Sequence, residues 1–205
     1  MLKIYGTKAS NNVQKVLWCC GELNLPFERD ENIGGPSRRD RTPAYLALNP
    51  NGLIPTIDED GFILWESNVI VRYLSAKHGM GKLCPSDLKQ RAEAERWMDW
   101  QQTALNASMG VAFRALLRKP AEATPEEQVN AAVKTAGDAW KILDARLADR
   151  PFVAGAVLTM GDIALGNAVH RWFKLPITRP ELPQVRRWYE RLCERPVYAQ
   201  HIASI

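Results

Sequence analysis

The pattern of apolar residues changes character part-way along this chain of 205 residues. Up to about residue 80, short apolar runs that are typical of strands alternate with stretches in which apolar residues recur every three or four positions, which is typical of helices. From Leu88 onward only the helical pattern remains. The sequence therefore predicts an α/β domain over residues 1–80 and an all-helical domain over residues 88–205, separated by a linker that contains Gly81 and Pro85.

The first domain is expected to run strand, helix, strand, helix, strand, strand, helix. The expected strands span residues 2–6, 26–32, 53–57 and 62–65, and the expected helices span residues 11–24, a short segment opened by Thr42 and Pro43, and residues 66–79. That is the order of a thioredoxin-like fold.

The second domain is expected to contain four helices, over residues 87–117, 124–149, 159–173 and 182–195. The first of these is long, and a bend is expected near Ser108–Gly110. Thr124 and Pro125 are expected to form the cap and first turn of the second helix.

Composition narrows the class of protein. The chain is 46% hydrophobic and 24% charged, with a net charge of +4, which is ordinary for a globular protein and too mild to indicate nucleic-acid binding. Its four cysteines and three histidines show no metal-ligand spacing, so no metal is expected. The sequence shows no signal-peptide pattern and no membrane-length apolar run. We therefore expect a soluble cytoplasmic protein.

Pro55 lies inside an apolar run, Leu53 to Ile57, that otherwise indicates a strand. Proline has no N–H for a sheet ladder and is confined to strand starts, edges and bulges. A cis peptide bond, which is tolerated before proline, would turn the backbone of Ile54 outward to pair with a peptide-like ligand as an added strand. A trans proline at a sheet edge would have no such role. The motif alone does not decide between the two.

Three polar residues, Ser10, Asn11 and Asn12, separate the first strand from the first helix. A helix N-terminus offers free N–H groups and partial positive charge, which stabilise a thiolate. No cysteine is present at this point, so Ser10 is a candidate donor to the thiolate of a ligand. The alternative is that these residues only cap the helix.

Glu66 and Ser67 begin the last helix of the first domain. The hydroxyl and N–H of Ser67 lie where an anion is favoured, and Glu66 could meet an ammonium group. The pair therefore suits the amino-acid end of a ligand, although a plain helix cap would explain Ser67 equally well. Together with Ser10 and Pro55, these residues describe a cleft for a thiol peptide.

On these motifs the chain resembles the bacterial cytosolic glutathione transferases, from end to end. The matching stretches are "NPNGLIP" and "WESNVIVRYL" in the first domain and "LTMGDIAL" and "WYERLCERPVY" in the second. In "LTMGDIAL", Thr159 and Asp162 are placed to form a capping box, and Leu158 and Ile163 a hydrophobic staple. The resemblance implies the glutathione transferase fold, a thioredoxin-like domain followed by an all-α domain.

The resemblance also implies roles for individual residues. Ser10 would hydrogen-bond the glutathione sulfur, with Asn12 as a second polar residue on the sulfur side. Ile54 would pair with the cysteinyl backbone ahead of cis-Pro55. Glu66 and Ser67 would hold the γ-glutamyl end.

The implied activity is detoxification by a homodimer, in which glutathione attacks a hydrophobic electrophile bound between the domains. The candidate residues for the electrophile pocket are Phe113, Arg114, Trp172 and Phe173, while Trp97 and Trp100 are expected in the core or the dimer interface. Two rival activities stay open: glutathione-dependent reduction of peroxides or disulfides, and glutathione binding without catalysis.

The chain departs from the family pattern at Leu53, where relatives often have a basic or amide residue that helps to hold the glycine carboxylate. Lys15, Arg38, Arg39 or Arg41 would have to replace it. Without a replacement, glutathione binding should be weaker.

Overall fold

A computed structural model describes residues 1–35, 37–118 and 123–203 of the chain. By their contacts the residues fall into two compact units. The first comprises Met1–Cys84 together with Pro196–Ile205, and the second comprises Pro85–Arg195. Among the helices of the described ranges, none combines the length and apolar character that a membrane span requires.

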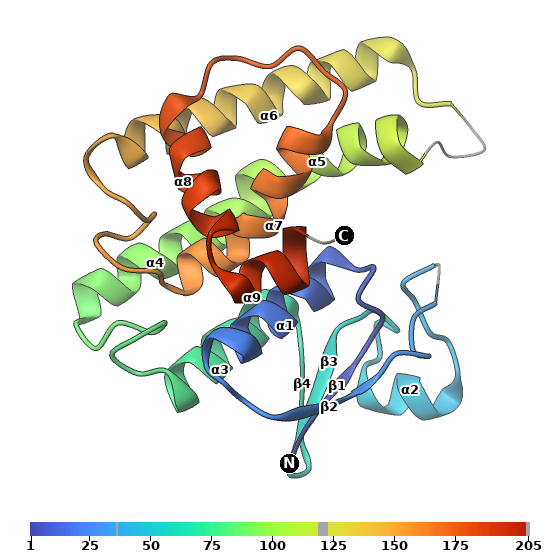
Figure 1. Ribbon diagram of the computed structural model, residues 1–205. Coiled ribbons are helices and arrows are strands. Elements are labelled where there is room, and N and C mark those ends of the chain that lie inside the picture. Colours follow the sequence, from blue (N-terminus) through green and yellow to red (C-terminus); the bar gives the residue numbers. More distant parts are fainter. Residues whose placement is uncertain (36, 119–122, 204–205) are drawn as a thin grey trace. The chain divides into compact units, whose positions relative to one another are not determined.

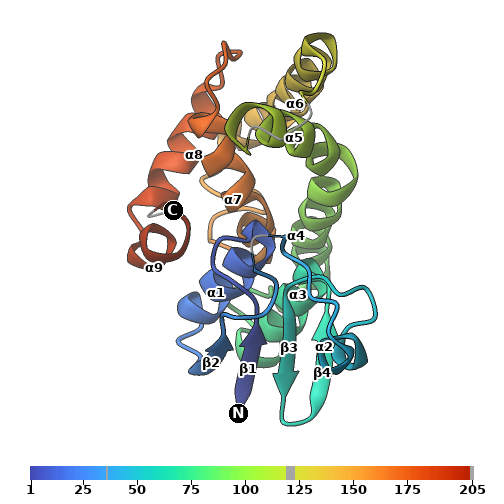
Figure 2. The same cartoon turned by 90° about the vertical axis from the view of Figure 1, so that its right-hand side faces the viewer.

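The first unit is built on a four-stranded sheet in the order β2-β1-β3-β4, which Figure 2 shows face-on. Its elements are β1 (Leu2–Tyr5), α1 (Asn11–Glu22), β2 (Phe27–Asp30), α2 (Pro43–Leu48), β3 (Thr56–Glu59), β4 (Phe62–Trp65) and α3 (Ser67–His78). β1 pairs in parallel with β2 and antiparallel with β3, and β3 pairs antiparallel with β4. The strand and helix order predicted from the sequence is confirmed.

Helices cover both faces of this sheet. α1 and α3 pack together on one side, and α2 lies on the other (Figure 1). The apolar face expected for α1 is buried at Val13, Val16, Leu17 and Cys20. On α3, Ile70 and Leu74 are buried as expected.

Residues 196–203 form a short helix, α9 (Pro196–Tyr198), and a π-helical turn, η4 (Ala199–Ala203). The sequence analysis assigned them to the helical domain, but their contacts lie with the first unit, where they pack on α1. Tyr198 meets Trp18 edge-on, with ring centroids 4.8 Å apart. The chain therefore returns to its first unit at its end.

The regular elements that the structure describes in the second unit are all helices or helical turns. Its elements are α4 (Leu88–Trp100), η1 (Gln101–Leu105), α5 (Asn106–Phe113), η2 (Arg114–Arg118), α6 (Glu126–Arg146), η3 (Leu147–Asp149), α7 (Met160–Lys174) and α8 (Pro183–Cys193). α4 packs on α7, α5 packs on α6, and α8 packs on both α6 and α7.

Two details of the helical unit differ from the sequence expectation. The irregularity in the long first helix is the π-helical turn η1 at Gln101–Leu105, one to two turns before the expected Ser108–Gly110. The helix α6 begins at Glu126 with Pro125 as its N-cap, and no side chain caps it. Thr124 is therefore not the capping residue that its position suggested.

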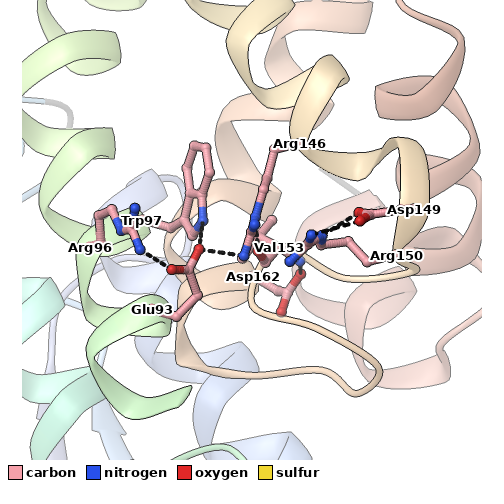
Figure 3. A network of polar contacts seen from close by, with 8 residues as sticks. All are labelled: Glu93, Arg96, Trp97, Arg146, Asp149, Arg150, Val153 and Asp162. Atoms are coloured by element: carbon pink, nitrogen blue, oxygen red, sulfur yellow. Dashed lines mark hydrogen bonds and ion pairs between the residues drawn. The ribbon is translucent and has the colours of Figure 1, made fainter. Parts of the chain in front are cut away.

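A polar network ties the helices of the second unit together (Figure 3). The carboxylate of Glu93 on α4 accepts hydrogen bonds from the Trp97 indole at 3.1 Å and from Arg146 of α6 at 2.5 Å, and it pairs with Arg96. Arg146 also donates to the carbonyl of Val153 at 3.3 Å. The network joins α4 to α6 through Glu93 and Arg146, whose charges are largely shielded from water, whereas Arg96 is exposed.

The capping box at the start of α7 is confirmed. The N–H and hydroxyl of Thr159 donate to Asp162 Oδ2 at 2.9 and 3.2 Å. Asp162 also accepts at Oδ1 from the N–H of Val153 and the indole of Trp188, both at 3.0 Å. Leu158 and Ile163, the expected staple residues, are both buried.

Candidate active site

Ser10 lies at the N-terminus of α1, directly after the loop that follows β1. It is the N-cap residue, with an extended backbone, and its side chain is only 3% exposed. Its hydroxyl makes no capping hydrogen bond, so the interpretation of Ser10 as a simple cap is not supported. Asn11 and Asn12 are the first two residues of the helix, and both are half-buried.

The loop before Ser10 is held by hydrogen bonds at both ends. The N–H of Gly6 donates to Asp30 of β2 at 2.9 Å, and the N–H of Ser10 donates to the carbonyl of Thr7 at 3.1 Å. The buried side chain of Gln14 donates to the carbonyl of Lys8 at 2.8 Å. Sequence reasoning missed Gln14, whose only signal was its polar character within a mostly apolar helix.

The peptide bond between Ile54 and Pro55 is cis. Ile54 precedes the β1–β3 ladder, which begins where Thr56 pairs with Tyr5. Its side chain is buried against Gly6 and Gly34, where an added Cβ would come within 3.1 and 2.7 Å of it. The side chain of Ile54 therefore points into the protein.

Tyr45 and Asn49 of the α2 region support this turn. The hydroxyl of Tyr45 donates to the carbonyl of Leu53 at 2.7 Å, and the amide of Asn49 donates to the same carbonyl at 2.8 Å. Both side chains also contact the Thr56 hydroxyl, at 2.8 and 3.1 Å. Burial raises the pKa of Tyr45, so its hydroxyl keeps its proton as a donor.

Gly34 packs directly against the side chain of Ile54 and leaves no room there for a side chain of its own. Its φ of +93° lies in the left-handed region, and an added Cβ would lie 2.7 Å from Ile54 Cδ1. Because the backbone and the contact both oppose a side chain, Gly34→Ala is expected to lower the free energy of unfolding by about 1–3 kcal/mol, as measured by urea denaturation.

The neighbouring glycine is a matched control for this prediction. Gly35 also has a positive φ, +40°, but an added Cβ there would meet nothing within 4 Å. Gly35→Ala therefore tests the backbone conformation without a contact to Ile54, and it should lower the free energy of unfolding by less than Gly34→Ala does. Equal losses in the two variants would contradict a role for the Ile54 contact.

Glu66 and Ser67 begin α3, but not in the way the capping interpretation assumed. Glu66 is the N-cap, with a positive φ of 73°, and Ser67 is the first helical residue. A non-glycine residue in the left-handed region is uncommon and occurs often at ligand sites. Ser67 is 2% exposed, and its hydroxyl has no hydrogen-bond partner within residues 1–35, 37–118 and 123–203. A buried hydroxyl of this kind is rare in proteins.

Lys15 is fully buried between α1 and α3, where its Nζ donates to Asn68 Oδ1 at 3.2 Å. Its partner Asn68 is the residue that follows Ser67 in the chain. Lys15 is therefore a poor replacement for the basic residue missing at Leu53. Sequence reasoning had grouped it with the loop arginines as a possible replacement, and its burial could not be seen from the sequence alone.

Arg39 is the loop arginine nearest to Leu53. The two residues form an isolated antiparallel bridge, in which directly opposed side chains lie on the same face. Arg39 is exposed, whereas Arg38 is half-buried and Arg41 lies outside the bridge. A positive charge is thus available beside the apolar side chain of Leu53.

The two cysteines of α1 are unsuited to redox chemistry. Cys19 and Cys20 are buried in α1, and burial raises the pKa of Cys19 to about 12 and that of Cys20 further still. Neither thiol forms the thiolate that disulfide exchange requires. Any thiol chemistry at this site must come from a ligand.

Comparison with known proteins places this geometry in a family. Residues 9–77 match the model of the glutathione S-transferase N-terminal domain, and residues 126–191 match that of the C-terminal domain. The chain is 39% identical to glutathione S-transferase GstB of Escherichia coli K12, over 96% of this chain and 95% of that protein. The chain belongs to the glutathione S-transferase family.

A solved structure is similar over nearly its whole length. The theta-class glutathione S-transferase of Xanthomonas axonopodis pv. citri, with glutathione bound, is 39% identical and superposes with a TM-score of 0.92, covering 98% of this chain and 96% of that one. Glutathione S-transferase F13 of Arabidopsis thaliana is 28% identical over 96% of this chain and 93% of its own length. The fold expected for a glutathione S-transferase is confirmed.

The four electrophile-pocket candidates of this glutathione S-transferase family member all lie in the helical unit, in different surroundings. Trp172 is fully buried, with its ring 6.2 Å from that of Trp140, so it packs in the core of the helical unit, and its place in the pocket stays a prediction. Phe173 is covered by Tyr189, whose ring centroid is 5.1 Å away, and by Arg186. Phe113 is half-buried and Arg114 is exposed.

Proposed function

We propose that this protein is a glutathione transferase whose first unit binds glutathione and activates its thiol for attack on an electrophilic small molecule. The observation that carries the proposal is a pair of buried serine hydroxyls at two helix N-termini of one unit. Ser10 makes no capping bond, and Ser67 has no partner among the described residues. Both are left available for a ligand.

Ser10 donates its hydroxyl to the glutathione sulfur in this proposal. A thiol has an unperturbed pKa of about 8.5, so only a minority is ionised at neutral pH. One hydrogen bond to the charged form is worth about 1.5–3 kcal/mol, which lowers the pKa by about 1–2 units. The N-terminus of α1, where Asn12 also lies, favours the same negative charge. The thiolate then predominates near pH 7.

The rest of the tripeptide is held by groups on both sides of the sulfur. The backbone of Ile54 pairs with the cysteinyl residue as an added strand ahead of Pro55. Ser67 and the N-terminus of α3 bind the γ-glutamyl carboxylate, and the exposed Glu66 binds its ammonium group. Contacts from three separate elements would thus hold the ligand in one orientation, with its thiolate positioned to react.

The glycine carboxylate pairs with Arg39, which takes the place of a basic residue at Leu53. Because Arg39 is exposed, we expect a modest effect. Arg39→Ala should raise the KM for glutathione about 2–5-fold with little change in kcat, while Arg41→Ala should change it less.

A glutathione ester tests this pairing directly. Esterification of the glycine carboxylate removes the charge that Arg39 binds. The ester should bind the parent protein about as weakly as glutathione binds Arg39→Ala, and the variant should not distinguish the two ligands. If the variant still prefers the free acid, another group holds the carboxylate.

The assembly proposed is a homodimer. Phe62 and Trp65 of β4 and Val69 of α3 are large apolar side chains that stay exposed, although Val69 was expected on the packed face of its helix. Exposed apolar residues gathered on adjoining elements are typical of protein interfaces. A sedimentation velocity run at micromolar concentration that gives a monomer would overturn this part.

The proposed setting is the cytoplasm, with removal of reactive electrophiles as the role. None of the four cysteines forms a disulfide. Cysteines that stay reduced are usual in a reducing compartment, which is also where glutathione is kept as the thiol. Glutathione is the only co-substrate that the proposal needs.

The function is tested by the ultraviolet absorbance of the thiolate. Glutathione is titrated from pH 5 to 10 with and without saturating protein, and conjugation of an aryl chloride is measured in parallel. We expect the apparent pKa of bound glutathione to fall below its value in free solution, together with turnover. Binding without a pKa shift or turnover would favour the rival non-catalytic role, and reduction of an organic peroxide without conjugation would favour a reductase.

A further inference from the structure

Phe113, at the end of α5, is flanked by two arginines of the helical unit. The guanidinium carbon of Arg171, on α7, lies 3.9 Å from the centre of the ring, and that of Arg118, at the end of η2, lies 5.5 Å away. Stacking on an aromatic face fixes the orientation of a guanidinium while leaving its N–H groups at the rim. Two cations are therefore held together around one ring.

Neither guanidinium is neutralised by a residue that the structure describes. Within residues 1–35, 37–118 and 123–203, the side chains of Arg171 and Arg118 form no ion pair or hydrogen bond, and their contacts are with the ring of Phe113. Burial and, to a smaller extent, the charge of Arg118 lower the pKa of Arg171 to about 10, so Arg171 still carries its charge at neutral pH. A shielded charge beside a like charge is costly unless an anion meets it.

Other arginines of the helical unit show what is unusual here. Arg146 is paired with Glu93, and Arg191 donates to the carbonyl of Pro151 at 2.8 Å. Arg186 stacks on Phe173 at the same 3.9 Å, but Arg186 is exposed to water. Arg171, which is half-buried, stacks on an aromatic ring and has no side-chain acceptor among the described residues, a combination that none of these other arginines shows.

We propose that the electrophile of this enzyme carries its own carboxylate or sulfonate, which binds to Arg171 and Arg118 beside Phe113. The inference rests on the proposed transferase function. It assigns the pocket candidate Phe113 to orienting Arg171, and it adds two residues that the sequence analysis did not single out. The substrate class is then an anionic electrophile rather than a neutral apolar one.

The reaction is a substitution in which atoms and charges balance. The glutathione thiolate forms a carbon–sulfur bond, and the leaving group, such as chloride, departs with the electron pair of its bond to carbon. The thiol proton has already passed to solvent when the thiolate formed. The acidic group of the electrophile does not react, so the arginines contribute binding and orientation.

Two matched electrophiles test the proposal. The anionic 4-chloro-3,5-dinitrobenzoate and the neutral 4-chloro-3,5-dinitrobenzamide share the same reacting carbon and leaving group. Each is assayed with the parent, Arg171→Gln, the more conservative surface variant Arg118→Gln, and the control Arg186→Gln. The control removes a guanidinium stacked at the same distance on Phe173.

We expect Arg171→Gln to lower kcat/KM for the benzoate about 10–50-fold, mainly through KM, and to leave the benzamide within about 2-fold, because a charge-assisted bidentate contact is lost only for the anion. Arg118→Gln should show a smaller loss in the same direction, and Arg186→Gln none. Because Arg118 is exposed, its variant keeps the test valid if Arg171→Gln fails to fold. An equal effect on both electrophiles, or none, overturns the proposal.

A binding measurement separates this proposal from the transferase function on which it rests. Calorimetric titration with the unreactive 3,5-dinitrobenzoate and 3,5-dinitrobenzamide needs no turnover. If the parent conjugates neither electrophile but binds the benzoate more tightly than the benzamide, and Arg171→Gln removes that preference, the anion site stands and the transferase proposal fails. If the benzoate and the benzamide bind equally to the parent, the anion site is overturned whatever the activity.

Discussion

Replacing Asp162 by alanine is expected to lower the free energy of unfolding by about 4 kcal/mol, because a fully buried acceptor would leave several donors without a partner. The carboxylate accepts from the N–H groups of Val153 and Thr159 and from the indole of Trp188, at 2.9–3.0 Å. These donors come from the loop before α7, from its N-cap and from α8. Urea denaturation followed by circular dichroism measures the loss.

A matched control separates this role from ordinary capping. Asp87 is the N-cap residue of α4 and accepts from the N–H of Gln90 at 2.9 Å, but unlike Asp162 it is exposed to water. Asp87→Ala should therefore cost about 1 kcal/mol, as is usual for a surface cap. Similar losses in the two variants would show that Asp162 is only a cap.

The titration of Asp162 gives a second readout. Burial raises its pKa to about 6 from the usual 3.8, and the hydrogen bonds from Val153, Thr159 and Trp188 pull it back only in part. The folded protein thus holds this proton more tightly than the unfolded chain. The stability that the folded protein gains from binding this proton is therefore fully present below about pH 4 and is lost as the pH rises through about 6. The stability of the parent relative to Asp162→Asn should fall between pH 4 and 7, and a relative stability that rises instead would contradict burial as the main cause.

Ser10→Ala is expected to lower kcat/KM about 10–100-fold at pH 6.5, because the thiolate loses one charge-assisted hydrogen bond. The pKa of bound glutathione should rise by about 1–2 units in the variant, so part of the activity should return at higher pH. Steady-state kinetics from pH 6 to 9, with thiolate absorbance on the same samples, measures both effects. Glutathione affinity should change little.

Asn12→Ala is the control for this prediction, since Asn12 lies on the same turn of α1. If Ser10 is the main donor, Asn12→Ala should lose less than about 3-fold of kcat/KM. A larger loss in Asn12→Ala than in Ser10→Ala would make Asn12 the main hydrogen-bond donor to the sulfur. If the pKa of bound glutathione stays low in both variants, the N-terminus of α1 is what stabilises the thiolate.

The order of elements and the capping box could be predicted from the sequence because both depend on local patterns. Apolar periodicity separates strands from helices, and the spacing from Thr159 to Asp162 is short enough to fix their contact. The turn at η1 could not be predicted, because wider helical hydrogen bonding has no periodic signature of its own. The packing of residues 196–203 on the first unit could not be predicted, because the apolar face of a helix does not show which part of the chain it packs against.

The candidate site divides in a similar way. Ser10, Pro55 and Ser67 follow from motifs that lie next to strand ends and helix starts. The pairing of Arg39 with Leu53 and the stacking of Arg171 on Phe113 depend on residues that are distant in the chain. A single arginine in a helix ordinarily indicates a solvated face, so nothing in the sequence marked Arg171.

The packing of α9 and η4 on α1 has a consequence for biosynthesis. The first unit contains residues from both ends of the chain, and the whole second unit is translated between them. A ribosome therefore releases the sheet and its helices long before the segment that covers Trp18 exists. The helical unit, although it comes second, is the first of the two for which every residue has been made.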